Sequence, residues 1–184
     1  MQWTVAGLGN PGKEYIGTRH NVGREFLEAL ARKLPPKTKI VLPDTYMNNS
    51  GRAFDKLVTS KKAAERLVVL HDDLDLPLGS VKISFGSGSG GHKGVESIQQ
   101  ALKTKDFVRI RIGISPRAPS GRTKKPDSTK VNDFVLGKFS TPEVEKLKKA
   151  RKTVAEALEI LLADPSSAGQ AARAHAMTAI NSKR

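Results

Sequence analysis

Apolar and polar residues follow one another along the chain in patterns that predict alternating strands and helices. Five stretches predict strands, because apolar residues either alternate with polar ones or run without a break. They are Gln2–Leu8, Lys39–Leu42, Leu67–Leu70, Val81–Phe85 and Val108–Ile114. The unbroken apolar run Leu67–Leu70 is typical of a buried parallel strand. Val108–Ile114 alternates isoleucine, expected inward, with arginine, expected outward.

Helical spacing fills the intervals between these strands. Val22–Leu34 keeps its apolar residues on one side and is stopped by two prolines. Further helices are predicted over Gly51–Thr59, Val95–Leu102, the stretch after Thr141 and the alanine-rich tail Ser166–Ile180. Thr141 is the expected N-cap of the long helix, with Pro142 in its first turn. The alternation predicts one α/β domain over residues 1–184 with a largely parallel sheet.

Periodicity disappears between Ser115 and Lys130. This stretch is rich in Pro, Ser and Thr, and it carries five basic residues against one acidic residue. We expect a mobile basic loop here, at about residues 115–130.

Composition removes several classes of chemistry. The chain contains no cysteine, which excludes disulfides, thiolate metal sites and a cysteine nucleophile. No apolar run approaches the ~18 residues needed to span a membrane, and Met1 leads directly into the first strand-like stretch. We therefore expect a soluble, intracellular protein without a membrane partner.

The net charge of +14, from 32 Lys and Arg against 18 Asp and Glu, changes the expected partner. A surplus this large favours a polyanion such as nucleic acid. Solubility alone is the alternative explanation of the charge.

The first strand ends in Gly7-Leu8-Gly9-Asn10-Pro11-Gly12, which formally matches the dinucleotide fingerprint GxGxxG. A dinucleotide site needs a helix that begins within the glycines. Pro11 instead favours an extended conformation at Asn10, and the residues after Gly12 lack helical spacing. The loop is therefore expected to hold the Asn10 side chain at the carboxyl edge of the sheet, or to be a simple tight turn.

His20 precedes the first helix, and Asp72 follows a buried strand, so both can reach the same edge of the sheet. A carboxylate bonded to one imidazole nitrogen fixes the tautomer and leaves the other nitrogen free to accept a proton from water. A metal site formed by His71, Asp72, Asp73 and Asp75 is an alternative, although the spacing matches no known metal motif.

Two further polar segments precede helices. Asn48, in Thr45–Gly51, either caps a helix or binds a substrate amide or carbonyl. The glycine-rich stretch Gly86–Gly94 can approach a phosphate or a ribose closely but lacks the Walker A spacing. The sequence has no Gly-x-Ser-x-Gly elbow, so water is the expected nucleophile of any hydrolysis.

Taken together, these motifs resemble the bacterial-type peptidyl-tRNA hydrolase family over nearly the whole chain. The motifs that carry the resemblance occur in the family's order. They are Gly7–Gly12, Thr18-Arg19-His20-Asn21, Tyr46-Met47-Asn48 with Ser50-Gly51, His71-Asp72 with Leu74-Asp75-Leu76-Pro77, Gly90-Gly91-His92, and Arg109–Ile114. The resemblance implies a monomer with a twisted, mostly parallel mixed sheet flanked by helices, and a cytoplasmic enzyme that hydrolyses the ester between peptide and tRNA. If the source is eukaryotic, the mitochondrial matrix or the ribosome is the alternative location.

The resemblance also implies residue roles. His20 would be the catalytic base and Asp72 its orienting partner. The substrate would contact Asn10, Tyr15, Met47, Asn48 and Lys93, while Lys82 and Arg111 would grip the tRNA 5′-phosphate. Peptidyl-tRNA and tRNA are the implied partners, and no cofactor or metal is expected.

Two departures from the family pattern bear on function. Lys93 stands where the family usually has an asparagine that helps to hold the substrate and its water, and the segment between His20 and Asn48 is about twenty residues short. The second departure predicts a short or missing strand near the middle of the sheet. Both departures, with the excess charge, would fit a non-catalytic RNA-binding or ribosome-associated relative. The retained Asn10, His20, Asn48 and Asp72 argue for the enzyme, and an oxidoreductase would depend on GxGxxG alone.

Overall fold

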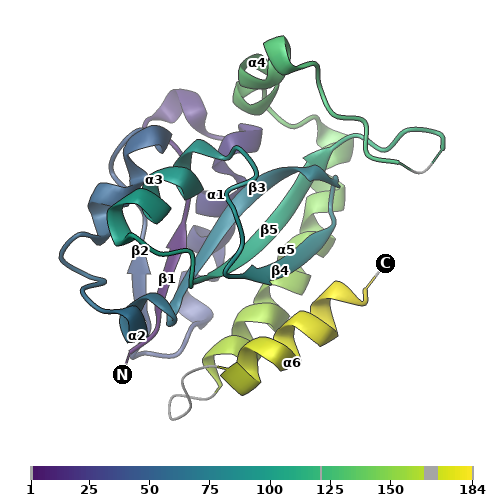
Figure 1. The fold of residues 1–184 in the computed structure, drawn as a ribbon. Coiled ribbons are helices and arrows are strands. Elements are labelled where there is room, and N and C mark those ends of the chain that lie inside the picture. Colours follow the sequence, from purple (N-terminus) through teal and green to yellow (C-terminus); the bar gives the residue numbers. More distant parts are fainter. Residues whose placement is uncertain (1, 121, 164–169, 184) are drawn as a thin grey trace.

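Five strands form one mixed sheet in the order β2-β1-β3-β5-β4 (Figure 1). This computed structural model describes residues 2–120, 122–163 and 170–183. The strands are β1 (Thr4–Gly7), β2 (Lys39–Val41), β3 (Leu67–Pro77), β4 (Val81–Phe85) and β5 (Val108–Ser115). Only β4 runs antiparallel, against β5, and all other pairs are parallel. The predicted α/β domain with a mostly parallel mixed sheet is confirmed.

Helices cover both faces of this sheet (Figure 1). The α-helices are α1 (Val22–Leu30), α2 (Lys61–Ala64), α3 (Lys93–Leu102), α4 (Val131–Leu136), α5 (Thr141–Leu162) and α6 (Gln170–Asn181). The 3₁₀ helices are η1 (Lys13–Tyr15), η2 (Arg19–Asn21), η3 (Ala31–Lys33), η4 (Met47–Phe54) and η5 (Ser128–Lys130). None of the described helices is long and apolar enough to cross a membrane.

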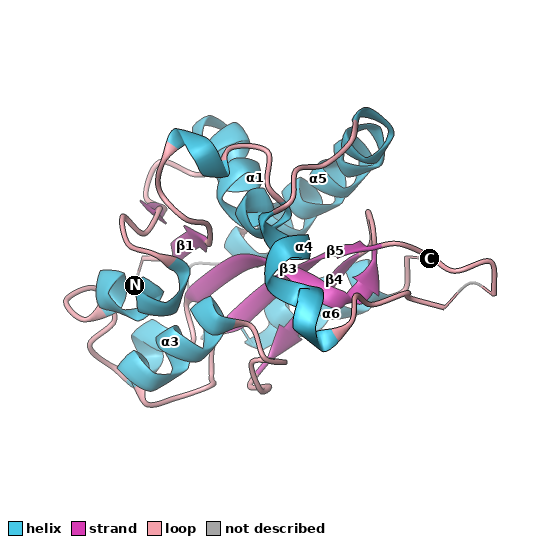
Figure 2. Cartoon of the chain, turned by 90° about the horizontal axis from the view of Figure 1, so that it is seen from above, coloured by secondary structure: helices cyan, strands magenta, loops and turns pink. Residues whose placement is uncertain are grey.

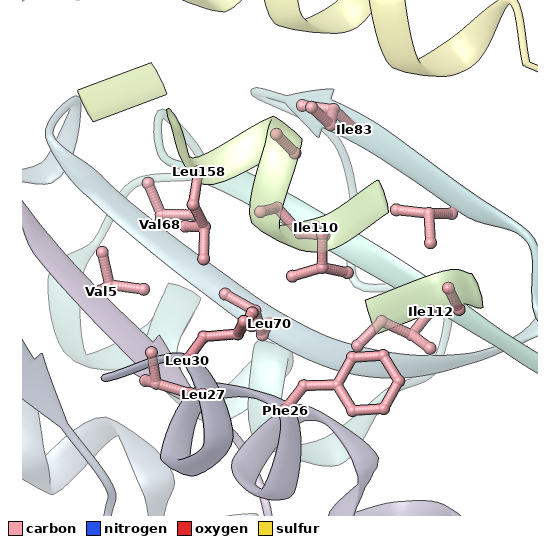
Figure 3. Close-up of a cluster of buried hydrophobic side chains, with 14 of the residues drawn as sticks. Val5, Phe26, Leu27, Leu30, Val68, Leu70, Ile83, Ile110, Ile112 and Leu158 are labelled. Carbon is pink, nitrogen blue, oxygen red and sulfur yellow. The ribbon is translucent and has the colours of Figure 1, made fainter. Parts of the chain in front are cut away.

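The central strand β3 is apolar on both faces because each face is covered. Val68 and Leu70 belong to the larger core, which α1 and α5 close from one side (Figure 3). Val69 and Leu67 belong to the second core, with Val95 of α3 and residues of η4. This double burial explains why the strand appears in the sequence as an unbroken apolar run.

The free edge of β4 is partly covered by α6. The Asn181 side chain accepts a hydrogen bond from the Ile83 amide at 2.7 Å and donates one to the Ile83 carbonyl at 2.9 Å. The amide side chain thus occupies backbone groups that a neighbouring strand would otherwise pair.

Several predicted boundaries are wrong, for identifiable reasons. β3 continues beyond Leu70 through the polar residues to Pro77, with an irregular register after Asp73. The helix predicted over Gly51–Thr59 is the 3₁₀ helix η4, which already begins at Met47. The N-cap of α5 is Ser140 rather than Thr141, because Ser140 and Glu143 form a reciprocal capping box.

Other expectations need correction in detail. Arg109 does not point outward into solvent but is buried, and its guanidinium donates to Ser87 Oγ and to the Gly88 carbonyl. The short strand after His20 is β2, which lies at an edge of the sheet and not near its middle. The predicted start of the tail helix at Ser166 lies outside the described residues, which resume in α6.

The basic segment after β5 contains local structure. Arg117 and Thr123 form an isolated antiparallel bridge, and Lys125 forms an ion pair with Asp75 near the end of β3. Its mobility remains a prediction.

Candidate active site

A cleft of about 290 Å³ opens at the carboxyl ends of the central strands. Seen from above, α4 lies over this part of the sheet (Figure 2). The walls of the cleft come from the end of β3, the glycine-rich loop before α3, and η5 with α4. The lining residues are His20, Asp72, Asp73, Leu74, Asp75, Ser89, Gly90, Gly91, His92, Lys93, Ser128, Val131, Asn132 and Val135. Ligands of open α/β sheets bind at this edge.

Backbone packing places His20 beside Asp72. A side chain at Gly23, in the first turn of α1, would meet the Leu70 carbonyl at 2.3 Å, so glycine allows α1 to lie directly on β3. His20, three residues earlier in η2, is thereby held over the strand that carries Asp72. Its Nδ1 lies 2.9 Å from Asp72 Oδ1 and 3.0 Å from Oδ2.

The protonation of this pair follows from its surroundings. Burial acts to raise the pKa of Asp72, but His20, His92 and their hydrogen bonds hold it well below the usual range. Burial also lowers the pKa of His20, yet the Asp72 charge and hydrogen bond outweigh it and leave a net raised value. Asp72 is therefore a carboxylate, and His20 donates Nδ1–H to it. His20 Nε2 makes no hydrogen bond to any described residue, so it can accept a proton.

Asn10 is fixed by three hydrogen bonds on a neighbouring loop. Its backbone N–H donates to Asn21 Oδ1 at 2.9 Å, and Asn21 Nδ2 returns a bond to the Asn10 carbonyl. Asn10 Oδ1 accepts from the Met47 amide at 2.8 Å. Nδ2 donates to no described residue and is the unused, neutral end of this side chain. Asn10 borders a neighbouring hollow with Asn21 and is not among the residues that line the cleft itself.

A second histidine contacts Asp72. His92 Nε2 lies 2.8 Å from Asp72 Oδ1, and its Nδ1 accepts from the amides of Gly94 and Val95 at 3.2 and 3.3 Å. His71 packs edge-on against His92 and is fully buried. Burial lowers the pKa of His71 well below its ordinary value, so His71 is neutral.

These groups fit a metal poorly. Among the described residues, His20, Asp72 and His92 are the group whose ligand atoms cluster, and the four-residue set considered from sequence does not come together. A metal at His92 Nε2 would move the ring proton to Nδ1. That proton would then face the two helix amides that Nδ1 now accepts from.

The other residues predicted to contact the substrate are placed differently. Met47 is buried beside Asn10, whereas Asn48 is exposed in η4 and does not line the cleft. Tyr15 packs edge-on against the exposed Tyr46, with ring centroids 6.4 Å apart. Lys93 lines the cleft at the start of α3, but its ammonium is exposed and lies 3.6 Å from Glu96 Oε2.

Lys82 and Arg111 face each other across the β4–β5 pair. Directly opposed residues of an antiparallel pair share one face of the sheet, so both cations project on the same side. Arg111 Nε also donates to Asp73 Oδ2 at 2.7 Å, which ties this pair to the residue next to Asp72.

The motifs predicted no role for three residues that make specific contacts. His92 lines the cleft and contacts Asp72, Asn21 holds the backbone of Asn10, and Tyr46 packs against Tyr15. All three lie inside the quoted motifs. His92 had a visible signal, because a polar residue after two glycines and before a helix can be an N-cap.

Comparisons with known proteins show the family to which the chain is similar. The family model for peptidyl-tRNA hydrolase matches residues 4–39 and 35–183. The peptidyl-tRNA hydrolase of Aquifex aeolicus is 42% identical over 181 residues, covering 85% of this chain and 90% of that protein. The peptidyl-tRNA hydrolase of Thermodesulfovibrio yellowstonii is 41% identical over 179 residues, with 86% and 89% covered.

The fold agrees as well. The crystal structure of peptidyl-tRNA hydrolase from Acinetobacter baumannii superimposes with a TM-score of 0.81 at 30% identity, covering 98% of this chain and 94% of that one. The resemblance seen in six ordered motifs is thus confirmed, and the chain belongs to the peptidyl-tRNA hydrolase family.

Proposed function

We propose that this protein hydrolyses the ester bond between a peptide and tRNA, releasing free tRNA. The observation that carries the proposal is the His20–Asp72 pair, which leaves His20, in the lining of the cleft, with an Nε2 that is not bonded to any described residue. The relatives described above carry the name of this enzyme, and the comparisons give no support to the non-catalytic alternative.

In the proposed reaction, His20 Nε2 accepts a proton from water while the water oxygen forms a bond to the ester carbonyl carbon. Asp72 keeps the proton of His20 on Nδ1 and stabilises the imidazolium that forms. The tetrahedral intermediate then collapses, the bond to the ribose oxygen breaks, and His20 returns its proton to that oxygen. Atoms and charge balance without a cofactor.

Asn10 is proposed to stabilise the oxyanion through its Nδ2 donor. Its oxygen is held by the Met47 amide, so the side chain cannot flip without losing that bond. A fixed donor of this kind costs no reorganisation when charge develops.

For the nucleic acid, we propose that Lys82 and Arg111 hold a phosphate of the tRNA and that Tyr15 with Tyr46 supports a base by stacking. The protein would act as a monomer in the cytoplasm. Coverage of the β4 edge by Asn181 removes one route to association through the sheet.

The test is release of peptide from N-acetyl-aminoacyl-tRNA. Wild-type protein should release it, and His20→Ala should lose about 10²–10⁴-fold in turnover with tRNA binding nearly unchanged. His175→Ala, at an exposed histidine of α6, is the matched control. Equal turnover by wild type and His20→Ala would remove the proposed base.

A further inference from the structure

The carboxylate of Asp72 is shared between two histidines, and the proposed chemistry uses only one of them. Asp72 Oδ1 lies 2.9 Å from His20 Nδ1 and 2.8 Å from His92 Nε2. The centroids of the two imidazole rings lie 5.0 Å apart, so the rings are neighbours that contact the same carboxylate.

The tautomer of His92 is fixed by helix α3. The first amides of a helix have no partner within the helix, and here Gly94 and Val95 donate to His92 Nδ1. A nitrogen that accepts two N–H groups has no room for its own proton. His92 therefore carries its proton on Nε2 and donates it to Asp72.

The backbone before the helix makes this geometry available. Gly90 and Gly91 have φ angles of +64° and +82°, in the left-handed region that other residues rarely adopt. The glycine pair turns the chain so that His92 reaches the N-cap of α3 and the carboxylate together. His71 packs edge-on against the His92 ring, with the two ring centroids 4.7 Å apart.

We propose that His92 is a positioning residue for hydrolysis, which holds the Asp72 carboxylate in place and reduces the effect of its charge on His20. This inference depends on the proposed function. The Nε2–H of His92 binds Oδ1, while His20 contacts both oxygens, so rotation of the carboxylate would break a bond. A carboxylate that already accepts one N–H also attracts the proton of His20 less strongly.

Two amide substitutions separate the two bonds of His92. Asparagine places an acceptor near the position of Nδ1, so His92→Asn keeps the helix cap and loses the donor to Asp72. Glutamine places a donor near the position of Nε2, so His92→Gln keeps the donor and weakens the cap.

The first readout is the pKa of His20 in the free full-length protein, from NMR titration of the imidazole nitrogens. The spectrum of His20→Ala identifies the His20 signal. The titration requires no substrate, so it stays informative even if the protein does not hydrolyse peptidyl-tRNA. His92→Asn should raise the His20 pKa above the wild-type value, and His92→Gln should leave it close to wild type.

The second readout is peptidyl-tRNA hydrolysis across pH. His92→Asn should lower kcat at neutral pH by on the order of tenfold and move the rising limb of the rate to higher pH. His92→Gln should keep a kcat and a pH dependence close to those of wild type, although its thermal unfolding should occur at lower temperature.

A wild-type His20 titration in folded His92→Asn would overturn the proposal. Equal losses in both variants without a pH shift would also overturn it, because they would indicate a purely structural cap. If His92→Asn does not fold, the His20 titration of His92→Gln decides: a wild-type value supports the proposal and a raised value overturns it.

Discussion

Arg111 donates its Nε–H to Asp73 Oδ2 at 2.7 Å, and Asp73 is the chain neighbour of the carboxylate that orients His20. Arg111, proposed to bind phosphate, and the proposed catalytic pair are thus linked through adjacent residues of β3. Lys82, opposite Arg111, forms no ion pair with the described residues and is exposed.

Replacement of Lys82 by Ala should weaken binding of different tRNAs about equally, because it removes a backbone phosphate contact and no base contact. The dependence of log affinity on log salt should flatten by about one unit. Arg111→Ala needs Asp73→Asn beside it, so that no unpaired carboxylate remains. Lys33→Ala, at an exposed lysine of η3, controls for charge alone. A loss limited to one tRNA sequence would contradict phosphate binding.

Asp72→Asn should move the pH dependence of kcat/KM to lower pH as well as reduce the rate. Burial lowers the pKa of His20, and Asp72 raises it above the ordinary 6.5. Without the Asp72 charge, the effect of burial remains, so His20 loses its proton at lower pH. Activity requires the unprotonated base and therefore rises with pH through the pKa of His20. A midpoint that stays at the wild-type pH would mean that another group controls the limb.

His71 should make the protein less stable as pH falls below about 6.5. Its pKa in the folded state is well below the ordinary value, chiefly through burial. Below about pH 6.5 the unfolded chain binds a proton at His71 and the folded protein does not. The free energy of unfolding therefore falls by up to about 1.4 kcal/mol per pH unit. In urea unfolding from pH 7 to pH 5, His71→Asn should lose less stability than wild type. His175→Asn should retain the wild-type slope. Parallel slopes for all three proteins would count against a neutral buried His71.

The basic segment should accelerate encounter with tRNA rather than the chemical step. Arg117→Gln, Arg122→Gln and Lys124→Gln together should slow association at low salt and leave turnover at saturation nearly unchanged. The ion pair between Lys125 and Asp75 is kept in this variant, because Asp75 lines the cleft. Three exposed lysines elsewhere, Lys33, Lys37 and Lys62, supply a control with the same charge change. A collapse of saturated turnover would show that the segment builds the site.

The sequence predicts the centre of this fold better than its margins. The apolar run before His71 and the alternating isoleucines of β5 are buried in the core. Because buried strands need apolar side chains, the sequence alone identifies both as inner strands. The extension of β3 to Pro77 is polar, and pairing with β5 stabilises it without an apolar signal. α4 has six residues, too few to display helical spacing.

Within the site, the pairing of His20 with Asp72 could be predicted from the sequence, because both residues are expected at the carboxyl edge of the parallel sheet. The contact of His92 with Asp72 could not. It depends on how Gly90 and Gly91 turn the loop, and on helix amides that decide which ring nitrogen carries the proton.

The Asn181 side chain forms with Ile83 the two backbone hydrogen bonds that a neighbouring strand would form at this position of β4. Shortening the protein before Asn181 would uncover the amide and carbonyl of Ile83 on an edge that also contains Val81 and Phe85. An uncovered edge of this kind is a template for pairing between molecules. Designers of shortened or tagged versions should therefore treat this asparagine as a guard against aggregation, and attach additions only beyond it.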